Sequence, residues 1–222
     1  NPALPQLLDG LHFHTLCEQD ADALAVTLDA VADKFGDLLS KMQWLNFGGG
    51  HHITRPGYDM ATLELCIHRA QNDWGVTVYL EPGEACALNA GYLLTRVLDV
   101  VQNGDTTIAI LDASAACHMP DVIEMPYRPP LLGADEPGEK ACTVRLAGPT
   151  CLAGDVIGDY SFDVVPAVGD LLVFGDMAIY TTCKNNTFNG MPLPSIYARE
   201  PNGIMREIVT FGYSDFKHRV GK

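Results

Sequence analysis

The segment QWLNFGGG, residues 43–50, decides the fold of this chain. Residues 43–47 are rich in large apolar side chains and have the length of a short buried strand, and three glycines end it. Apolar residues recur at spacings of three and four before this segment, over about 20–42, and after it, over about 59–72. A strand with an amphipathic helix on either side is typical of parallel strands joined by crossover helices.

Two further short apolar segments, residues 11–15 and 76–80, extend this pattern to three strands. Asp20 and Asp22 stand where the first helix should begin, and acidic residues favour a helix N-terminus. Three parallel strands with two helices cannot close a barrel, and the chain begins with Asn1 rather than Met. We therefore expect that an upstream segment is missing. The alternative is a small open α/β layer that is complete in itself.

The pattern changes after Glu81, where short β-rich segments follow one another without long helices between them. These segments are residues 90–101, 106–111, 141–147 and 170–174. Residues 126–140 hold several prolines and glycines and are expected to form a loop or a strand crossover. We predict an α/β domain over residues 1–88 and an all-β domain over residues 89–222, with room for the chain to re-enter the first near its C-terminal end.

Composition limits the partners of this chain. A formal net charge of -14 and an isoelectric point near 4.7 oppose a broad attraction to nucleic acid or to anionic lipid. Seven cysteines without a CxxC pair indicate reduced thiols. No apolar run approaches the roughly 20 residues of a membrane span, and no signal segment opens the chain. We predict a cytoplasmic protein with a small cationic ligand, no nucleic-acid partner and no membrane contact.

Gly48, Gly49 and Gly50 follow a strand and precede a helix, where backbone N–H groups can approach a phosphate closely. A plain turn is an equally good interpretation, because their spacing is not that of the dinucleotide-binding motif. Glu81, in the tripeptide EPG, ends the next strand, so its carboxylate should face the same end of the sheet. A charged turn is the alternative for this tripeptide.

His12, His14, His51 and His52 suggest a metal site, because HxH on a strand points both rings to one face. No carboxylate or thiolate stands at a typical companion spacing in the sequence, so we predict no metal. One ring at a strand end can instead stack on a flat cofactor.

Cys151 lies in the loop GPTC, residues 148–151, with Asp155 nearby. A thiol in such a loop can donate or accept a proton, although an unassigned cysteine is more often an ordinary half-buried thiol. Tyr180 follows the strand that ends at Phe174 and can bring a hydroxyl group to a bound anion. A tyrosine in the core is the alternative.

Taken in order, these pieces resemble a known family. They are FHT at 13–15, FGGG at 47–50, EPG at 81–83, GPTC at 148–151, GDLLVFGDMAIYT at 169–181 and TFNG at 187–190. Their order and spacing resemble the fold type III pyridoxal 5'-phosphate (PLP) dependent decarboxylases of the ornithine and diaminopimelate decarboxylase superfamily. Longer phrases are similar to the carboxynorspermidine decarboxylase branch: LHFHTLCEQ at 11–19, GGGHHIT at 48–54, CHMPDVIEMPYRP at 117–129 and CLAGD at 151–155.

The resemblance implies an architecture and a reaction. The chain would hold the last strands of a PLP-binding (β/α)8 TIM barrel and a C-terminal β-barrel or β-sandwich domain, within a homodimer that shares its active sites. The reaction would be decarboxylation of carboxynorspermidine or carboxyspermidine to norspermidine or spermidine, in polyamine biosynthesis. The barrel segment that precedes this chain would be a further partner.

The family's motifs also imply roles for individual residues. His14 would stack on the pyridine ring, Gly48 to Gly50 would hold the phosphate, and Tyr180 would add a phosphate contact. Glu81 would pair with the ring nitrogen, and keeping that nitrogen protonated makes the ring an electron sink. Cys151 would reach in from the partner subunit and protonate the reacting carbon, which makes it the third expected catalytic residue beside His14 and Glu81. Asp155 would hold the cationic substrate, with Asp121 and Glu124 as weaker assignments for the same task.

Two features depart from the family's pattern. Many relatives follow EPG with an arginine that binds the phosphate, whereas this chain has Glu84, which we expect to point elsewhere. The lysine that forms the Schiff base lies on an early barrel strand that this sequence lacks, and neither Lys34 nor Lys41 matches it. We therefore expect this chain alone to be inactive.

Two other functions stay open. Diaminopimelate decarboxylase shares the cofactor motifs but needs a basic group for its substrate's distal carboxylate. The segment 118–129 offers acids there, although Arg128 keeps this alternative open. The second alternative is a noncatalytic regulatory homologue, against which the retention of Cys151, Glu81 and the triple glycine argues.

Overall fold

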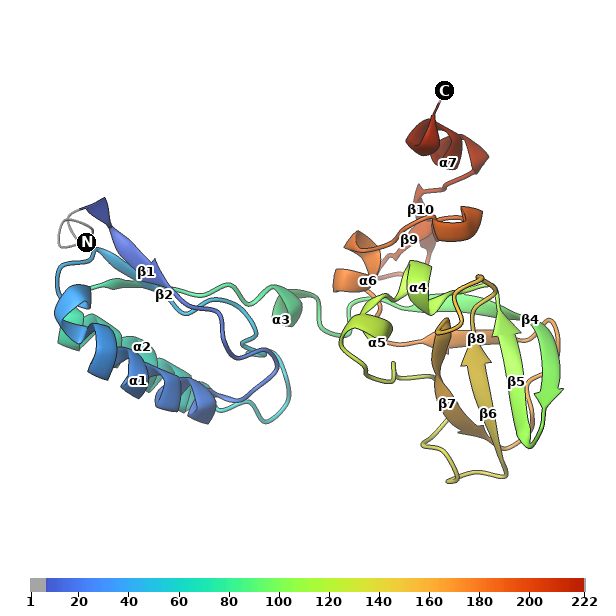
Figure 1. Cartoon of the computed structure of the whole chain (residues 1–222), viewed down its shortest axis with the longest axis horizontal. Helices are drawn as coiled ribbons and strands as arrows, with labels where there is room; N and C mark the ends of the chain where they lie inside the picture. The colour runs from blue at the N-terminus through green and yellow to red at the C-terminus, as the bar shows by residue number, and fades with distance from the viewer. Residues whose placement is uncertain (1–6, 222) are drawn as a thin grey trace. The chain divides into compact units, whose positions relative to one another are not determined.

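The structure is a computed structural model that describes residues 7–221 (Figure 1). The chain divides into two compact units: unit 1 ends at Leu88 and unit 2 begins at Asn89. Within the described residues, no helix is both long enough and apolar enough to cross a membrane.

Unit 1 is an α/β layer. Its elements are β1 (Gly10–His12), α1 (Ala21–Leu39), β2 (Trp44–Asn46), α2 (Met60–Trp74), β3 (Thr77–Tyr79) and α3 (Gly83–Ala87). The sheet order is β1-β2-β3 and both pairings are parallel, which confirms the expected strands and their direction. The element ends differ by up to three residues from the expected ones. The helices α1 and α2 pack side by side on one face of the sheet (Figure 1).

Capping residues set where the two long helices begin. Asp20 Oδ1 accepts hydrogen bonds from the N–H of Ala21 at 2.8 Å and from the N–H of Asp59 at 3.0 Å. Asp59 in turn accepts from the N–H and the hydroxyl of Thr62. Gly75, with a φ of 69°, ends α2 in the left-handed conformation that favours glycine. Asp20 therefore links the starts of both helices.

The two faces of the sheet in unit 1 differ. Leu45 is fully buried against the helices, while the neighbouring Trp44 lies on the other face and contacts Tyr79 edge to face, with ring centroids 6.3 Å apart. Tyr79 is 52% exposed. His12 and Asn46 stand in register with Tyr79, so all three side chains point to this second face. This face is therefore polar and aromatic rather than an apolar core.

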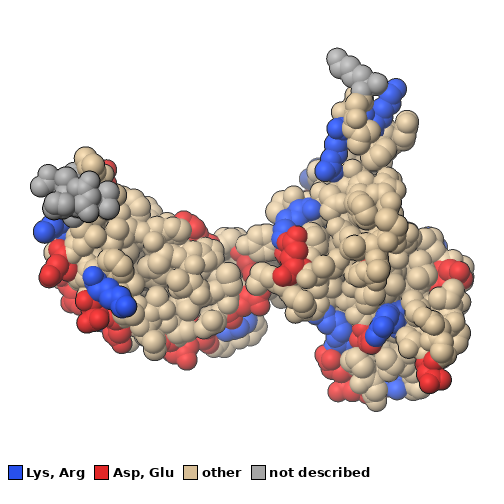
Figure 2. Space-filling model, viewed as in Figure 1, with Lys and Arg blue, Asp and Glu red and all other residues tan. Residues whose placement is uncertain are grey.

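Figure 2 shows patches of acidic side chains on the side of unit 1 that holds the helices. Those on α1 include Asp29, Asp33 and Asp37, which are all exposed. These residues contribute to the negative net charge of the chain.

Unit 2 is built on a mixed sheet. Its main elements are β4 (Leu93–Asn103), β5 (Thr106–Leu111), α4 (Ala115–His118), α5 (Asp121–Glu124), β6 (Cys142–Ala147), β7 (Val156–Phe162), β8 (Leu171–Phe174), α6 (Ile179–Cys183), β9 (Ile196–Arg199), β10 (Met205–Val209) and α7 (Tyr213–Val220). The order of the five-stranded sheet is β7-β6-β5-β4-β8, and β9 and β10 form a separate antiparallel pair. Its core includes Leu111, Val144, Leu146, Tyr160 and Phe174.

The connection between β5 and β6 is a crossover, because these two strands are parallel. The expectation of a loop or a strand crossover over residues 126–140 is therefore confirmed, as a crossover. Leu131 in this connection bridges Phe174 of β8, and Asp135 bridges Ser161 of β7. One segment thus contacts both edge strands of the sheet.

The strands β7, β9 and β10 were not expected from the sequence. In β7, Gly158 and Asp159 interrupt the run of apolar residues that indicates a strand. Its ladder with β6 forms nevertheless, and within it Arg145 on β6 stands opposite Asp159 and holds it with two hydrogen bonds of 2.7 and 2.9 Å.

Candidate functional site

The expected cofactor residues of unit 1 gather at the carboxyl ends of its three strands. His14 follows β1, Gly48 follows β2 and Glu81 follows β3. The N–H of Glu81 donates to the carbonyl of Gly48 at 2.8 Å, and the N–H of Gly49 donates to His14 Nδ1 at 3.3 Å. The prediction that Glu81 and the glycines lie at the same end of the sheet is confirmed.

The three glycines are required because neighbouring backbone approaches them closely. At Gly48, with a φ of +76°, an added Cβ would lie 2.4 Å from a carbonyl oxygen of the loop after β1. At Gly50, with a φ of +83°, the corresponding distance is 2.5 Å. At Gly49 the added Cβ would lie 2.8 Å from the carbonyl of Glu81. Side chains on this loop would therefore push apart the segments that carry His14 and Glu81.

Two of the backbone N–H groups of the glycine loop already donate to side-chain acceptors. The N–H of Gly48 donates to Asn46 Oδ1 at 2.8 Å, and that of Gly49 donates to His14. A phosphate bound here would use the N–H of Gly50 or would replace one of these side-chain acceptors.

The His14 ring is held at both nitrogens. Because Nδ1 accepts from the N–H of Gly49, the proton of the neutral ring lies on Nε2. Nε2 lies 3.4 Å from Cys17 Sγ. Sequence reasoning missed Cys17, since a single cysteine with no partner in the sequence carries no signal.

Asn46 orients the carboxylate of Glu81. Asn46 Nδ2 donates to Glu81 Oε1 at 2.7 Å, and His12 Nε2 lies 3.8 Å from the same oxygen. The Glu81 side chain is 50% exposed, so it is open to a ligand. Sequence reasoning missed Asn46 as well, although a polar residue in a short apolar strand just before the glycines was a usable signal.

His12, His14 and Glu81 also form a cluster of donor atoms that all lie within 4.8 Å of one another. The expectation of no metal rested on the spacing of possible ligands along the sequence. That spacing does not report the distance between Glu81 and the histidines in space, because Glu81 follows a different strand. The absence of a metal stays a prediction.

The other two histidines have separate partners. His51 is buried, with Nε2 3.4 Å from the carbonyl of Phe47, and burial lowers its pKa. His52 Nε2 lies 3.0 Å from a carboxylate oxygen of Glu84. Glu84 is thus turned to the His52 ring.

In unit 2, Cys151 is exposed and its backbone is held by a residue that sequence reasoning did not single out. The N–H of Cys151 donates to Asn189 Oδ1 at 2.9 Å. Asn189 has a φ of 57°, a left-handed conformation in which asparagine is one of the better tolerated residues. This contact ties the Cys151 loop to the TFNG segment, residues 187–190.

Asp155 is 3% exposed, and its carboxylate already has several donors. It accepts from the Ser114 hydroxyl at 2.9 and 3.0 Å, from the N–H of Ala116 at 3.2 Å, and from the Thr150 hydroxyl at 2.6 Å. A buried carboxylate with these partners is poorly placed to hold a substrate ammonium. We therefore revise the role expected for Asp155, from direct substrate contact to holding the loop that carries Cys151.

Asp121 and Glu124 of α5 share one cation. Lys184 Nζ lies 2.5 Å from Asp121 Oδ1 and 2.5 Å from Glu124 Oε2, and these hydrogen bonds hold the pKa of Lys184 well above its ordinary value. Lys184 directly follows α6, which carries Tyr180, and its Nζ lies 6.0 Å from the Tyr180 ring centroid. The Tyr180 side chain is about half exposed.

Comparison with known proteins decides the family. Residues 16–178 match the model described as the C-terminal sheet domain of the pyridoxal-dependent decarboxylases. The chain is 44% identical to the carboxynorspermidine/carboxyspermidine decarboxylase of Campylobacter jejuni, over 96% of this chain and 58% of that protein. This chain belongs to the pyridoxal-dependent decarboxylases.

One further relative and one solved structure are similar to this chain over nearly its whole length. It is 43% identical to the carboxyaminopropylagmatine decarboxylase of Synechocystis sp., over 98% of this chain and 57% of that protein. The crystal structure of the Campylobacter jejuni carboxynorspermidine decarboxylase complexed with norspermidine matches with a TM-score of 0.85, over 95% of this chain and 60% of that one. The chain therefore spans about three fifths of the length of these relatives.

The residue types of unit 1 fit the cofactor after which the pyridoxal-dependent decarboxylases are named. Glu81 provides an exposed carboxylate for a pyridine nitrogen, and the fixed His14 ring provides a flat surface. The glycine loop keeps open the space that a Cβ would fill, next to both side chains.

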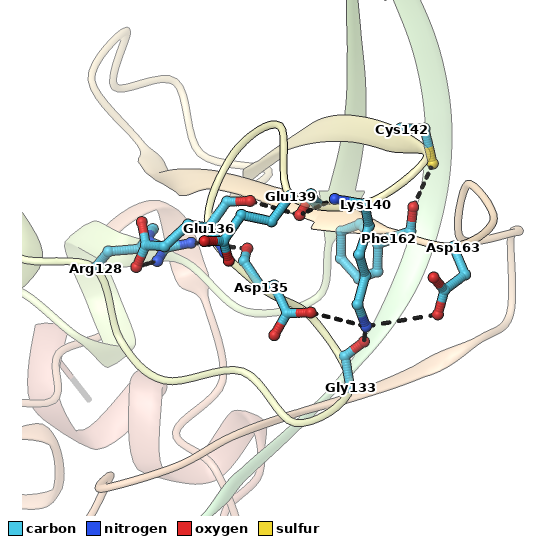
Figure 3. A network of polar contacts seen from close by, with 10 residues as sticks. Arg128, Gly133, Asp135, Glu136, Glu139, Lys140, Cys142, Phe162 and Asp163 are labelled. Carbon is cyan, nitrogen blue, oxygen red and sulfur yellow. Dashed lines mark hydrogen bonds and ion pairs between the residues drawn. The ribbon is translucent and has the colours of Figure 1, made fainter.

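Arg128, which kept the diaminopimelate alternative open, is used inside unit 2 (Figure 3). It donates to the carbonyls of Asp135 and Asp159 at 3.1 and 3.2 Å, and it pairs with Glu136. Its guanidinium also lies 4.8 Å from the centroid of the Tyr160 ring. An arginine with these four partners is not available to a substrate carboxylate.

Proposed function

We propose that the protein containing this chain decarboxylates carboxynorspermidine or carboxyspermidine, with PLP as its cofactor, to norspermidine or spermidine. The observation that carries the proposal is the convergence of Glu81, His14 and the glycine loop at one end of the sheet in unit 1. The identity of 44% to the Campylobacter jejuni relative over 96% of this chain supports the choice of substrate.

The residues of unit 1 would bind and orient the cofactor. PLP, when bound, supplies an electron sink for the charge left behind when carbon dioxide departs. The Glu81 carboxylate, oriented by Asn46, would keep a proton on the pyridine nitrogen. His14 would stack on the ring, and the glycine loop together with Tyr180 would bind the phosphate.

Cys151 would donate the proton that replaces the departing carboxyl group. Its thiol is exposed, and Asn189 and Asp155 hold its loop at two points. In a homodimer with shared sites, the partner's Cys151 would serve the cofactor bound by this chain. Asp121 and Glu124 would hold the cationic tail of the substrate.

The finer architecture belongs to the same proposal. The face of the sheet in unit 1 that points away from α1 and α2 would line the interior of a (β/α)8 barrel, whose helices lie outside, and β1 to β3 would be its last strands. The segment that contacts both edge strands in unit 2 suits a β-barrel rather than a β-sandwich. The Schiff-base lysine would lie outside this chain, and the enzyme would work in the cytoplasm.

A comparison of substrates tests the activity. We expect the intact protein to release carbon dioxide from carboxynorspermidine or carboxyspermidine, and not from diaminopimelate. Carboxyaminopropylagmatine belongs in the same assay, because the Synechocystis relative is named for it. Turnover of diaminopimelate alone would refute the proposal.

The Glu81→Gln variant tests the site itself. It keeps the size of the side chain and removes its charge, so we expect kcat to fall about 100-fold or more, as when one preorganised electrostatic contact is removed. Glu64→Gln, an exposed carboxylate on α2, is the matched control and should not change kcat. Equal kcat values in the two variants would show that Glu81 has no role in the site.

A further inference from the structure

The acidic pair of α5 is already an alkylammonium receptor. Lys184 presents a primary ammonium on a flexible butyl chain, and both Asp121 and Glu124 accept hydrogen bonds from it at 2.5 Å. The terminal aminoalkyl group of a polyamine has the same chemistry. The proposed function assigns the substrate's tail to the same two carboxylates, so the lysine and the substrate would compete for them.

The exposure of this cluster makes exchange feasible. The side chains of Lys184, Asp121 and Glu124 are 34%, 23% and 57% exposed. An ion pair near the surface contributes little net free energy, because water solvates both partners well when they separate. Replacing one ammonium by another also keeps both carboxylates paired, which avoids the large penalty of an unpaired charge.

We propose that Lys184 is an intramolecular competitor, which occupies Asp121 and Glu124 in the absence of substrate and is displaced by a primary ammonium of the substrate's tail. This inference rests on the proposed function, because that function brings a polyamine to the acidic pair.

The exchange would set specificity as well as affinity. Only a tail that ends in a cation can replace the lysine between two carboxylates. The distal end of diaminopimelate carries a carboxylate beside its ammonium, and that carboxylate would be repelled by Asp121 and Glu124. Competition by Lys184 would thus lower the affinity of the site for substrates whose tails bind Asp121 and Glu124 weakly.

The Lys184→Met variant tests the proposal, because it keeps the length of the side chain and removes the competing charge. We expect the affinity of the PLP-loaded intact protein for norspermidine, measured by calorimetry, to rise. If Lys184 holds the pair about nine tenths of the time, the rise should be about tenfold. The KM for carboxynorspermidine should fall in parallel. Lys184→Arg keeps a cation in place and should stay close to the wild type.

Lys140 provides a matched control in the same unit (Figure 3). Its Nζ also lies between two carboxylates, at 3.3 Å from Asp135 and 3.5 Å from Asp163, but no residue of this cluster is assigned to the substrate. Lys140→Met should therefore leave the affinity for norspermidine unchanged. An equal gain in both lysine variants would reflect net charge alone and would overturn the proposal.

A purely structural role of Lys184 predicts the opposite result. Lys184→Met would then lose PLP or kcat, through displacement of α6, without any gain in norspermidine affinity, and the proposal would be wrong. If this variant does not fold, Lys184→Gln decides, because it also removes the competing charge: the exchange model predicts tighter norspermidine binding, and a structural role predicts no gain.

The same experiments separate the two proposals. Wild-type protein that binds norspermidine but releases no carbon dioxide from carboxynorspermidine refutes the proposed function, while the calorimetry still tests the exchange. Normal turnover with no effect of Lys184→Met refutes the exchange alone. Wild-type protein that neither binds norspermidine nor releases carbon dioxide refutes the proposed function and the exchange together.

Discussion

The Gly48→Ala substitution is the sharpest test of the glycine loop. Its φ of +76° lies in the left-handed region, where a side chain costs about 1–2 kcal/mol. The new Cβ would also lie 2.4 Å from the carbonyl of Phe13, whereas ordinary contact begins at 3.4 Å, so the two segments must separate by about 1.0 Å. Overpacking of this kind costs about 1–3 kcal/mol. We expect a total loss of about 2–5 kcal/mol in the free energy of unfolding.

Gly57→Ala separates the two contributions. Gly57 has nearly the same φ, +81°, but an added Cβ there would meet nothing within 4 Å. It should therefore lose only the conformational part, about 1–2 kcal/mol. Urea unfolding of both variants of the intact protein gives these values from the shift of the midpoint at unchanged slope.

Cofactor binding gives a second measurement on the same pair of variants. Gly48→Ala moves the loop after β2 away from the loop that carries His14, so the affinity for PLP should fall at least about tenfold, which corresponds to 1.4 kcal/mol. Gly57→Ala should bind PLP normally. If both variants lose the same stability and the same affinity, the close approach at Gly48 is not what the loop requires, and the reasoning is refuted.

Two further predictions concern buried groups of unit 2. Asp155→Ala leaves the donors of Ser114 and Thr150 without their acceptor, so it should lower the free energy of unfolding by about 2–5 kcal/mol and reduce kcat by disordering the Cys151 loop. Unchanged stability in urea would contradict this role. Burial lowers the pKa of His118 below its ordinary value of 6.5, so the unfolded chain takes up a proton that the folded protein resists. The contribution of His118 to stability is therefore complete above pH 6.5 and is lost as the pH falls below it. His118→Gln should flatten the dependence of the unfolding free energy on pH in that window, and an unchanged slope would contradict the assignment.

Local sequence determined most of unit 1. Apolar spacing indicated α1, α2 and the three strands, because a helix or strand that buries one face must repeat apolar residues at its own period. Gly48 to Gly50 and Glu81 were placed at one end of the sheet for a similar reason, since each follows a strand and parallel strands end on the same side. The family motifs FHT, FGGG and EPG lie in or beside these same short segments.

Side-chain partners were decided only by the tertiary structure. Asn46 and Glu81 are 35 residues apart in the sequence, and Lys184 and Asp121 are 63 apart. No local pattern indicates that Asp155 is buried among donors from other segments, or that Lys184 occupies the acids assigned to a substrate. Local periodicity reports which face of an element is buried, but the neighbours of a polar group depend on how distant segments pack together, and these neighbours determine whether a charged group can bind a ligand.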